Sequence, residues 1–179
     1  MPTKQSKKTN KNSCPKAYLQ WATAFVLCLS LFSCNSFIYD ETQTIEAEAW
    51  TEDNNVTFNF SIDDTTKHYN IFLEIDHSVH YGYQNVYCNV VSLVDDRLIQ
   101  KQQVSLELAD KKGKWKGDCS SENCTRMIPF IVNTRFDQSG DYKIVLTQYT
   151  RQSDLTGINS LRLMIEETEL KAKSTDSII

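Results

Sequence analysis

Glycine and proline are scarce in this chain, with 5 glycines and 3 prolines in 179 residues. No glycine-rich phosphate loop, no Gly-x-Ser-x-Gly motif and no cysteine–histidine pairing of a nucleophile and its base is present. No internal repeat or proline-rich linker divides the chain. We therefore expect one folded domain that has no catalytic centre and needs no cofactor.

Acidic residues are absent from the first 33 positions, which carry five lysines. The one apolar run there extends from about Trp21 to Phe32, much shorter than the roughly 20 residues of a membrane-spanning helix. A basic segment followed by a short apolar run is typical of a secretory signal. We therefore expect residues 1–33 to be removed on export.

The apolar run ends at Leu31-Phe32-Ser33-Cys34, which resembles the bacterial lipobox. In that motif the cysteine thiol receives a diacylglyceryl group and becomes the first residue after cleavage. The alternative is an ordinary cleavable signal with a cysteine there by chance. Because two or three acyl chains anchor a protein stably where one does not, we expect Cys34 to be a lipid anchor. The expected organisation is a signal peptide (1–33), a lipid-anchored domain (34–168) and a polar C-terminal tail (169–179).

The expected mature chain is strongly acidic. It keeps all 23 acidic residues but only 14 of the 19 basic ones, a net charge of −9. A protein with this charge is a poor ligand for nucleic acids or anionic surfaces. We expect no nucleic-acid partner, and membrane attachment through the lipid alone.

Three of the 6 cysteines remain in the expected folded domain: Cys88, Cys119 and Cys124. Cys119 and Cys124 flank a short polar loop in a protein expected to be exported, so we predict a disulfide between them. Cys88 lies between Val86 and Val90 on an apolar face, and we expect a reduced core thiol. Two cysteines without a nearby histidine do not supply the four ligands of a zinc site, so we expect no metal.

The mature region alternates apolar and polar residues with period two, the pattern of half-buried strands. Turn-forming residues, among them Asp63-Asp64 and Asp95-Asp96, fall between the runs. No window shows a long amphipathic helix. The sequence therefore predicts an all-β fold, a single antiparallel β-sandwich of seven or eight strands. The apolar runs are Val56–Ile62, Tyr69–Ile75, Val86–Val90, Val104–Leu108, Ile128–Val132, Tyr142–Leu146 and Leu161–Ile165, with an eighth strand near Phe37–Ile45.

Few side chains are candidates for chemistry or binding. His77 and His80 are three residues apart, but between two strands that spacing does not align side chains, and we expect both in a solvated loop. The segment Lys111–Lys116 is basic and contains Trp115. Trp115 either packs into the core or contacts a protein partner or a glycan with an exposed ring.

Several segments, in this order and spacing, resemble the gliding motility lipoprotein GldH family of the Bacteroidota. Leu106–Gly117 (LELADKKGKWKG) matches the family's LELADKxGKWxG stretch. Further matches are Tyr39-Asp40-Glu41, Ile45, Trp50, Tyr81–Val86 (a YPYxNL-like element), Arg126–Phe130 (RIPY-like), Phe136, Gly140, Tyr142, Arg151, Leu155 and Gly157-Ile158. The chain departs from the family at Asp76, Gly82, Arg162 and Met164, and at the Cys119–Cys124 loop.

The resemblance implies a non-enzymatic lipoprotein of the outer membrane, associated with gliding and type IX secretion, whose partners are other envelope proteins. The residues after Cys34 lack the acidic cluster often seen on surface-exported lipoproteins of this phylum, which favours the periplasmic side. The alternative function is glycan capture by a surface β-sandwich, with Tyr81, Tyr83 and Tyr87 on one exposed face. Asp64-Thr65-Thr66 also resembles the O-glycosylation acceptor of this phylum, which makes Thr65 a candidate modification site.

Overall fold

The computed structural model describes residues 37–168, and these form eleven strands and one 3₁₀ turn. All described strand pairs are antiparallel, and the predicted all-β class is confirmed. The elements are β1 (Phe37–Thr44), η2 (Glu46–Glu48), β2 (Ala49–Thr51), β3 (Val56–Ile62), β4 (His68–Ser78), β5 (Asn85–Val94), β6 (Arg97–Glu107), β7 (Asp118–Cys119), β8 (Asn123–Thr134), β9 (Gly140–Gln148), β10 (Asp154–Thr156) and β11 (Ile158–Thr168).

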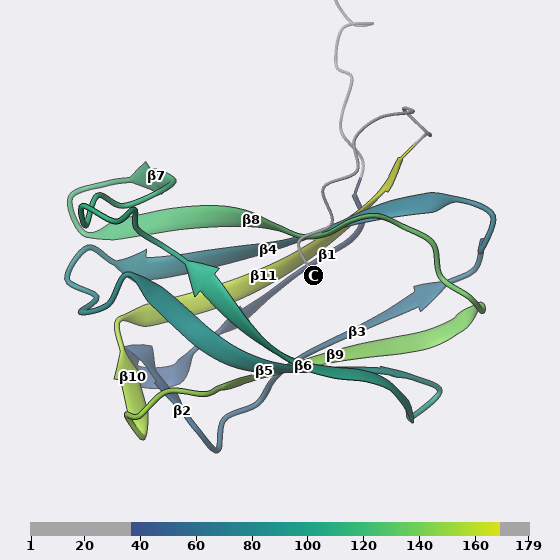
Figure 1. Ribbon diagram of the computed structural model, residues 1–179, viewed down its shortest axis with the longest axis horizontal. Helices are drawn as coiled ribbons and strands as arrows, with labels where there is room; N and C mark the ends of the chain where they lie inside the picture. Colours follow the sequence, from purple (N-terminus) through teal and green to yellow (C-terminus); the bar gives the residue numbers. More distant parts are fainter. Residues whose placement is uncertain (1–36, 169–179) are drawn as a thin grey trace, which may run out of the picture. The chain divides into compact units, whose positions relative to one another are not determined.

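Two sheets form the layers of a sandwich (Figure 1). The five-stranded sheet has the order β1-β11-β4-β8-β7, and the four-stranded sheet has the order β3-β9-β5-β6. The short strands β2 and β10 pair separately at one end. Because β3 and β4 are consecutive but lie in different layers, as do β8 and β9, the chain crosses between the sheets several times, as in other β-sandwiches.

The period-two pattern of the sequence becomes the inner face of each sheet. On β4 the alternate residues from Tyr69 to His77 are all buried, and on β9 Tyr142, Ile144 and Leu146 face them from the other layer. One continuous apolar core results, and Trp50, Phe58 and Leu163 are among its fully buried members. Burying a large apolar side chain contributes about 1.5–3 kcal/mol, so this core supplies the main favourable term of folding.

The strand count exceeds the prediction, because β2, β7 and β10 contain only two or three residues each. The first half of β6 also escaped prediction, since every residue from Arg97 to Gln103 is exposed. On β8 two register shifts place Ile131 against the core and leave Val132 53% exposed. The predicted inward set of β8 was therefore wrong at Val132.

Asp95 and Asp96 form the two-residue turn of the β5–β6 hairpin. Both residues have positive φ, 46° and 59°, as a type I′ turn requires. Asp95 also accepts a hydrogen bond from the Asp141 backbone N–H (3.3 Å), and Lys143 forms an ion pair with Asp96 (2.8 Å). These aspartates are thus turn residues, in agreement with the sequence-based interpretation.

Candidate functional site

His77 does not lie in a solvated loop, and the sequence-based prediction was wrong for this residue. It is the penultimate residue of β4 and is completely buried. Its Nδ1 lies 3.0 Å from the Ser78 carbonyl oxygen, whereas its Nε2 has no hydrogen-bond partner. The period-two pattern of β4 continues one step beyond Ile75 to His77, which is the signal that could have found it. His80, in contrast, is exposed in the following turn.

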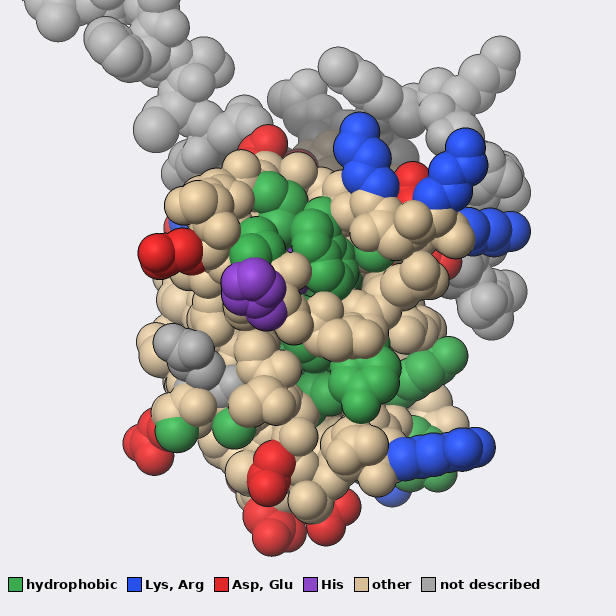
Figure 2. Space-filling view, turned by 90° about the vertical axis from the view of Figure 1, so that its left-hand side faces the viewer, with side chains coloured by type: hydrophobic (Ala, Val, Ile, Leu, Met, Phe, Trp, Pro, Cys, Tyr) green, Lys and Arg blue, Asp and Glu red, His purple; other side chains and the backbone are tan. Residues whose placement is uncertain are grey.

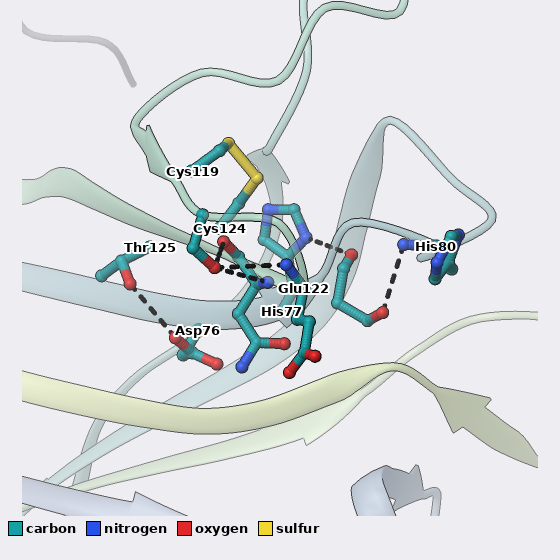
Figure 3. The surroundings of a disulfide bond; sticks show 10 residues. Asp76, His77, His80, Cys119, Glu122, Cys124 and Thr125 are labelled. Atoms are coloured by element: carbon teal, nitrogen blue, oxygen red, sulfur yellow. Dashed lines mark hydrogen bonds between the residues drawn. A yellow bond between two sulfur atoms is a disulfide. The ribbon is translucent and has the colours of Figure 1, made fainter.

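The β7–β8 hairpin lies next to His77, and the structure joins Cys119 and Cys124 by a disulfide across its turn. Figure 3 shows the His77 ring close to this hairpin, whereas His80 points away from it. The Val79 N–H donates to the Glu122 carbonyl (2.8 Å), which ties the β4–β5 turn to the hairpin. Cys88 is a buried free thiol on β5, and burial raises its pKa to about 12.

The loop between β6 and β7 is organised around Asp110. Its carboxylate accepts the backbone N–H groups of Lys112 (2.8 Å) and Lys114 (3.0 Å), and these bonds hold the pKa of Asp110 below its usual value. Gly113, at φ 82°, closes the turn. The loop therefore displays the side chains of Lys111, Lys112 and Lys114 to solvent. Within residues 37–168 none of these three lysines forms an ion pair, whereas Lys116 pairs with Glu107.

Trp115 fixes this basic loop to the sandwich. Its ring centroid lies 4.6 Å from that of His77 and 6.5 Å from that of Tyr81, and the indole packs against the core. Trp115 as a whole is only partly buried. The structure thus favours the packing alternative for Trp115.

Tyr81 is 5% exposed, so the predicted exposed face of Tyr81, Tyr83 and Tyr87 does not form as expected. The Tyr81 hydroxyl donates to the Asn85 carbonyl (3.1 Å), and burial raises its pKa. Tyr83 and Tyr87 are exposed, and sequence reasoning missed a third exposed ring, Tyr149. The Tyr149 N–H donates to the Tyr87 carbonyl (2.7 Å), so Tyr149, which directly follows β9, lies beside Tyr87 on β5.

These features meet at one end of the sandwich, where β4 and β6 end and β7 and β8 begin (Figure 1). Figure 2 looks onto this end: hydrophobic side chains reach its surface, and lysine and arginine side chains stand along one side. We call the surface formed by Tyr83, Lys111, Lys112, Lys114 and Trp115 the basic end. An exposed aromatic edge beside three cations is suited to binding an acidic protein surface or a carbohydrate.

Other features of the described residues are weaker candidates for a functional site. A cavity of about 380 Å³ near the β5–β6 turn is lined by eight residues, among them Asp95, Asp96 and Lys143, and its Asp96–Lys143 pair is already formed. Among residues 37–168 no three histidine, cysteine, aspartate or glutamate side chains are placed to hold a metal ion. Within the same residues no helix has the length and hydropathy needed to cross a membrane.

Two predicted sites are not part of this end. Cys34, the expected lipid anchor, lies outside the described residues, as do the signal segment 1–33 and the tail 169–179. Thr65 is half-buried in the turn between β3 and β4. Its neighbour Thr66 donates its N–H (2.8 Å) and its hydroxyl (2.6 Å) to the Asp64 carboxylate.

Comparison with known proteins shows which family this chain resembles. Residues 37–165 match the GldH lipoprotein family. The gliding motility lipoprotein GldH homolog of Christiangramia forsetii is 27% identical over 140 residues, which are 76% of this chain and 85% of that protein. The gliding motility lipoprotein GldH of Flavobacterium johnsoniae is 24% identical over 147 residues, which are 78% and 91% of the two chains.

The solved structures that resemble the fold do so only weakly. An uncharacterized protein of Listeria monocytogenes aligns with 69% of this chain and 11% of its own, at a TM-score of 0.32 and 16% identity. A likeness at that level has no bearing on function. The family match, in contrast, spans β1 to β11 and includes the basic end. On this evidence the chain belongs to the GldH lipoprotein family.

Proposed function

We propose that this protein is a non-enzymatic envelope lipoprotein that serves as a structural or assembly component of the gliding and type IX secretion machinery. The observation that carries the proposal is the match of residues 37–165 to a family whose named members are gliding motility lipoproteins. The proposed anchor is Cys34, and the proposed location is the outer membrane, with the domain on the periplasmic side. The proposed partners are other envelope proteins.

The basic end is the surface we assign to partner contact. It combines the exposed Tyr83 and the partly buried Trp115 with three lysines that have no ion-pair partner within residues 37–168, on an expected mature chain of net charge −9. A charged loop held by an internal carboxylate is preorganised, so binding costs little conformational entropy. An acidic surface on an envelope protein complements this loop best.

Gene deletion with complementation tests the function. We expect deletion to abolish surface spreading or to retain type IX cargo inside the cell, and the wild-type gene to restore both. The Cys34→Ala gene should fail to restore them. A gene in which Lys111, Lys112 and Lys114 are all changed to glutamate should restore spreading and secretion poorly. The control variant Lys101→Glu on β6 should restore both fully. A deletion strain with normal spreading and normal secretion contradicts the proposal.

Glycan capture is the second candidate function, and one specific observation favours it. Tyr83, Tyr87 and Tyr149 are 48%, 52% and 56% exposed, and an exposed aromatic ring can stack on a sugar face. A glycan array probed with the soluble domain tests this function. Binding that disappears in Tyr87→Ala and Tyr149→Ala supports it, and an array without signal rejects it.

We also propose O-glycosylation at Thr65. Its turn lies between two strands at the surface, and the Thr65 hydroxyl has no hydrogen-bond partner within residues 37–168, whereas that of Thr66 is bound to Asp64. Glycopeptide mass spectrometry of the native protein should find the sugar on Thr65. An unmodified peptide rejects the assignment.

A further inference from the structure

An apolar patch lies on the outer face of the five-stranded sheet. Because Ile71 and Leu73 point into the core, Phe72 between them points outward. In the strand register Phe72 lies between Pro129 on β8 and Met164 on β11, and these apolar residues form one row across the sheet. Pro129 is exposed, whereas Met164 is completely buried. The Phe37 ring lies 6.5 Å from that of Phe72, centroid to centroid.

Met127 extends this row. It faces Glu74 in the register, which places it outward as well, and it is 42% exposed. We call Phe37, Phe72, Met127 and Pro129 the outer patch; Met164, which is completely buried, is not part of this surface. Apart from Val132 on β8, the other outward residues of β4, β8 and β11 are polar, as is usual for an antiparallel sheet face that meets water.

The outer patch lies next to the proposed lipid anchor. Phe37 is the first residue of β1, three residues after Cys34. A chain of three residues spans at most about 11 Å whatever its conformation. Acyl chains on Cys34 therefore hold the start of β1, and Phe37 with it, close to the membrane surface.

The charged side chains around the outer patch are partly paired. Arg162 donates to both oxygens of Asp40 at 2.6 Å and approaches Glu74 at 3.4 Å, so one cation serves two carboxylates. Glu166 keeps its negative charge and accepts a hydrogen bond from the Asn70 amide (3.0 Å). Paired charges lose less hydration free energy than isolated ones when they approach a lipid surface.

The other surface near the start of β1 is unsuited to lipid. It consists of the turns at that end of the sandwich, which carry Asp63, Asp64, Asp95 and Asp96. Asp95 and Asp96 form ion pairs with Arg97 and Lys143, whereas Asp63 and Asp64 form none within residues 37–168. Carboxylates are repelled by anionic headgroups and lose hydration on contact with the interface. The face of the sheet is therefore the better membrane contact than its end.

We propose that the anchored protein rests with the outer patch against the phospholipid surface that holds its acyl chains. This inference depends on the proposed lipidation of Cys34 and adds to it an orientation. The five-stranded sheet faces the bilayer, and the four-stranded sheet with Tyr87 and Tyr149 faces away from it.

Tryptophan quenching by brominated phospholipids tests the orientation. The lipidated mature protein is placed in liposomes of phosphatidylethanolamine and phosphatidylglycerol, with and without bromine on the acyl chains. Met127→Trp introduces a reporter on the outer patch, and the matched control Tyr87→Trp introduces one at an exposed position of the other sheet. Wild-type emission, from Trp50 and Trp115, is subtracted. We expect the added emission of Met127→Trp to fall by at least half and that of Tyr87→Trp to stay within a tenth.

The outcomes separate the two proposals. The intact mass of the same preparation measures acylation of Cys34, and an unmodified Cys34 overturns both lipidation and orientation. An acylated protein in which Met127→Trp is unquenched, or in which Tyr87→Trp is quenched as strongly, overturns the orientation alone. If Met127→Trp lowers the melting temperature, Phe72→Trp, which replaces one ring by another, takes its place as the reporter, and the same two quenching results support or overturn the orientation.

Discussion

The rings of His77 and Trp115 lie 4.6 Å apart, centroid to centroid, and this contact joins the end of β4 to the basic loop. His77 is completely buried, and Trp115 is the only aromatic residue of the 108–117 segment. The position of the loop lysines thus depends on a histidine that contributes packing and one hydrogen bond, with its Nε2 unpartnered.

Replacement of His77 should show that its role is packing. His77→Ala removes the ring beneath Trp115 and should destabilise the fold by about 2–4 kcal/mol, as large-to-small core changes do. His77→Leu loses the Nδ1 hydrogen bond but also removes an unsatisfied buried nitrogen, so its cost should stay below about 1.5 kcal/mol. Urea denaturation of both variants measures this. Equal, large losses would contradict the packing role.

Gly117→Ala should be among the most damaging single changes in the chain. Gly117 has φ 113°, and a Cβ there would lie 2.3 Å from the Thr125 carbonyl oxygen. Positive φ and a backbone clash together should cost about 2–4 kcal/mol. Gly82→Ala is the control, because nothing lies within 4 Å of its added Cβ. Thermal melts should separate the two variants clearly, and indistinguishable melts would refute the assigned clash.

The three cysteines of the domain should behave differently. Closing a loop as short as Cys119–Cys124 removes only about 2 kcal/mol of unfolded-state entropy. Cys119 and Cys124 changed together to serine should therefore lower the melting temperature modestly. Cys88→Ser places a hydroxyl in an apolar layer and should cost about 1–3 kcal/mol.

Alkylation under native, oxidising conditions provides the matching chemical test. Neither Cys119 nor Cys124 should react, because they are joined. Cys88 should react only after unfolding, because it is buried and its thiol pKa is raised to about 12. Free thiols at Cys119 and Cys124, or a bridge to Cys88, would contradict this pairing.

The ion pair of Asp40 and Arg162 should make the fold less stable at acidic pH than at neutral pH. The hydrogen bonds from Arg162 hold the pKa of Asp40 below its usual value. The pKa of Asp40 is lower in the folded state than in the unfolded state, where it is about 3.9, so the ionised carboxylate stabilises the fold at pH values above about 3.9. This stabilisation is lost as the pH falls through the folded-state pKa. Asp40→Asn should therefore cost up to about 1 kcal/mol at pH 7, as expected of a half-exposed pair.

That cost should shrink as the pH falls from 5 to 2. Denaturation of the wild type and of Asp40→Asn across this range measures the difference. Asp53→Asn is the control, since Asp53 forms no ion pair within residues 37–168. A difference that grows towards low pH would contradict the assigned pairing.

The strands that the sequence predicted are those in which every second residue is apolar and packs into the core. Val56–Ile62, for example, is β3 residue for residue. The first half of β6 was not predictable from hydropathy, because its residues are exposed on both faces and are strand only through their ladder to β5. β2 and β10 likewise exist only because they pair with one another. Periodicity reports burial and not hydrogen bonding, and so it misses such strands.

Only part of the candidate site could be predicted from the sequence. The lysines and Trp115 were apparent as a basic aromatic segment, but their anchor was not. His77 was assigned to a loop because the predicted strand ended at Ile75, although His77 follows Ile75 at the inward spacing of β4. Tyr81 was assigned to an exposed face, whereas its hydroxyl donates to the Asn85 carbonyl and its ring packs beside Trp115. Both residues are buried by contacts between segments that are distant in the sequence, which hydropathy along the chain does not show.

Lipidation of Cys34 is the central claim, and detergent-phase partitioning with mass analysis of the N-terminus tests it most directly. The wild-type protein should enter the detergent phase and begin with an acylated Cys34, because two or three acyl chains anchor a protein stably and an expected mature chain of net charge −9 is repelled by anionic lipid. Cys34→Ala should remain an uncleaved precursor or partition into the aqueous phase. An unacylated cysteine in the wild type, or detergent partitioning of both proteins with the same processed N-terminus, would contradict the account.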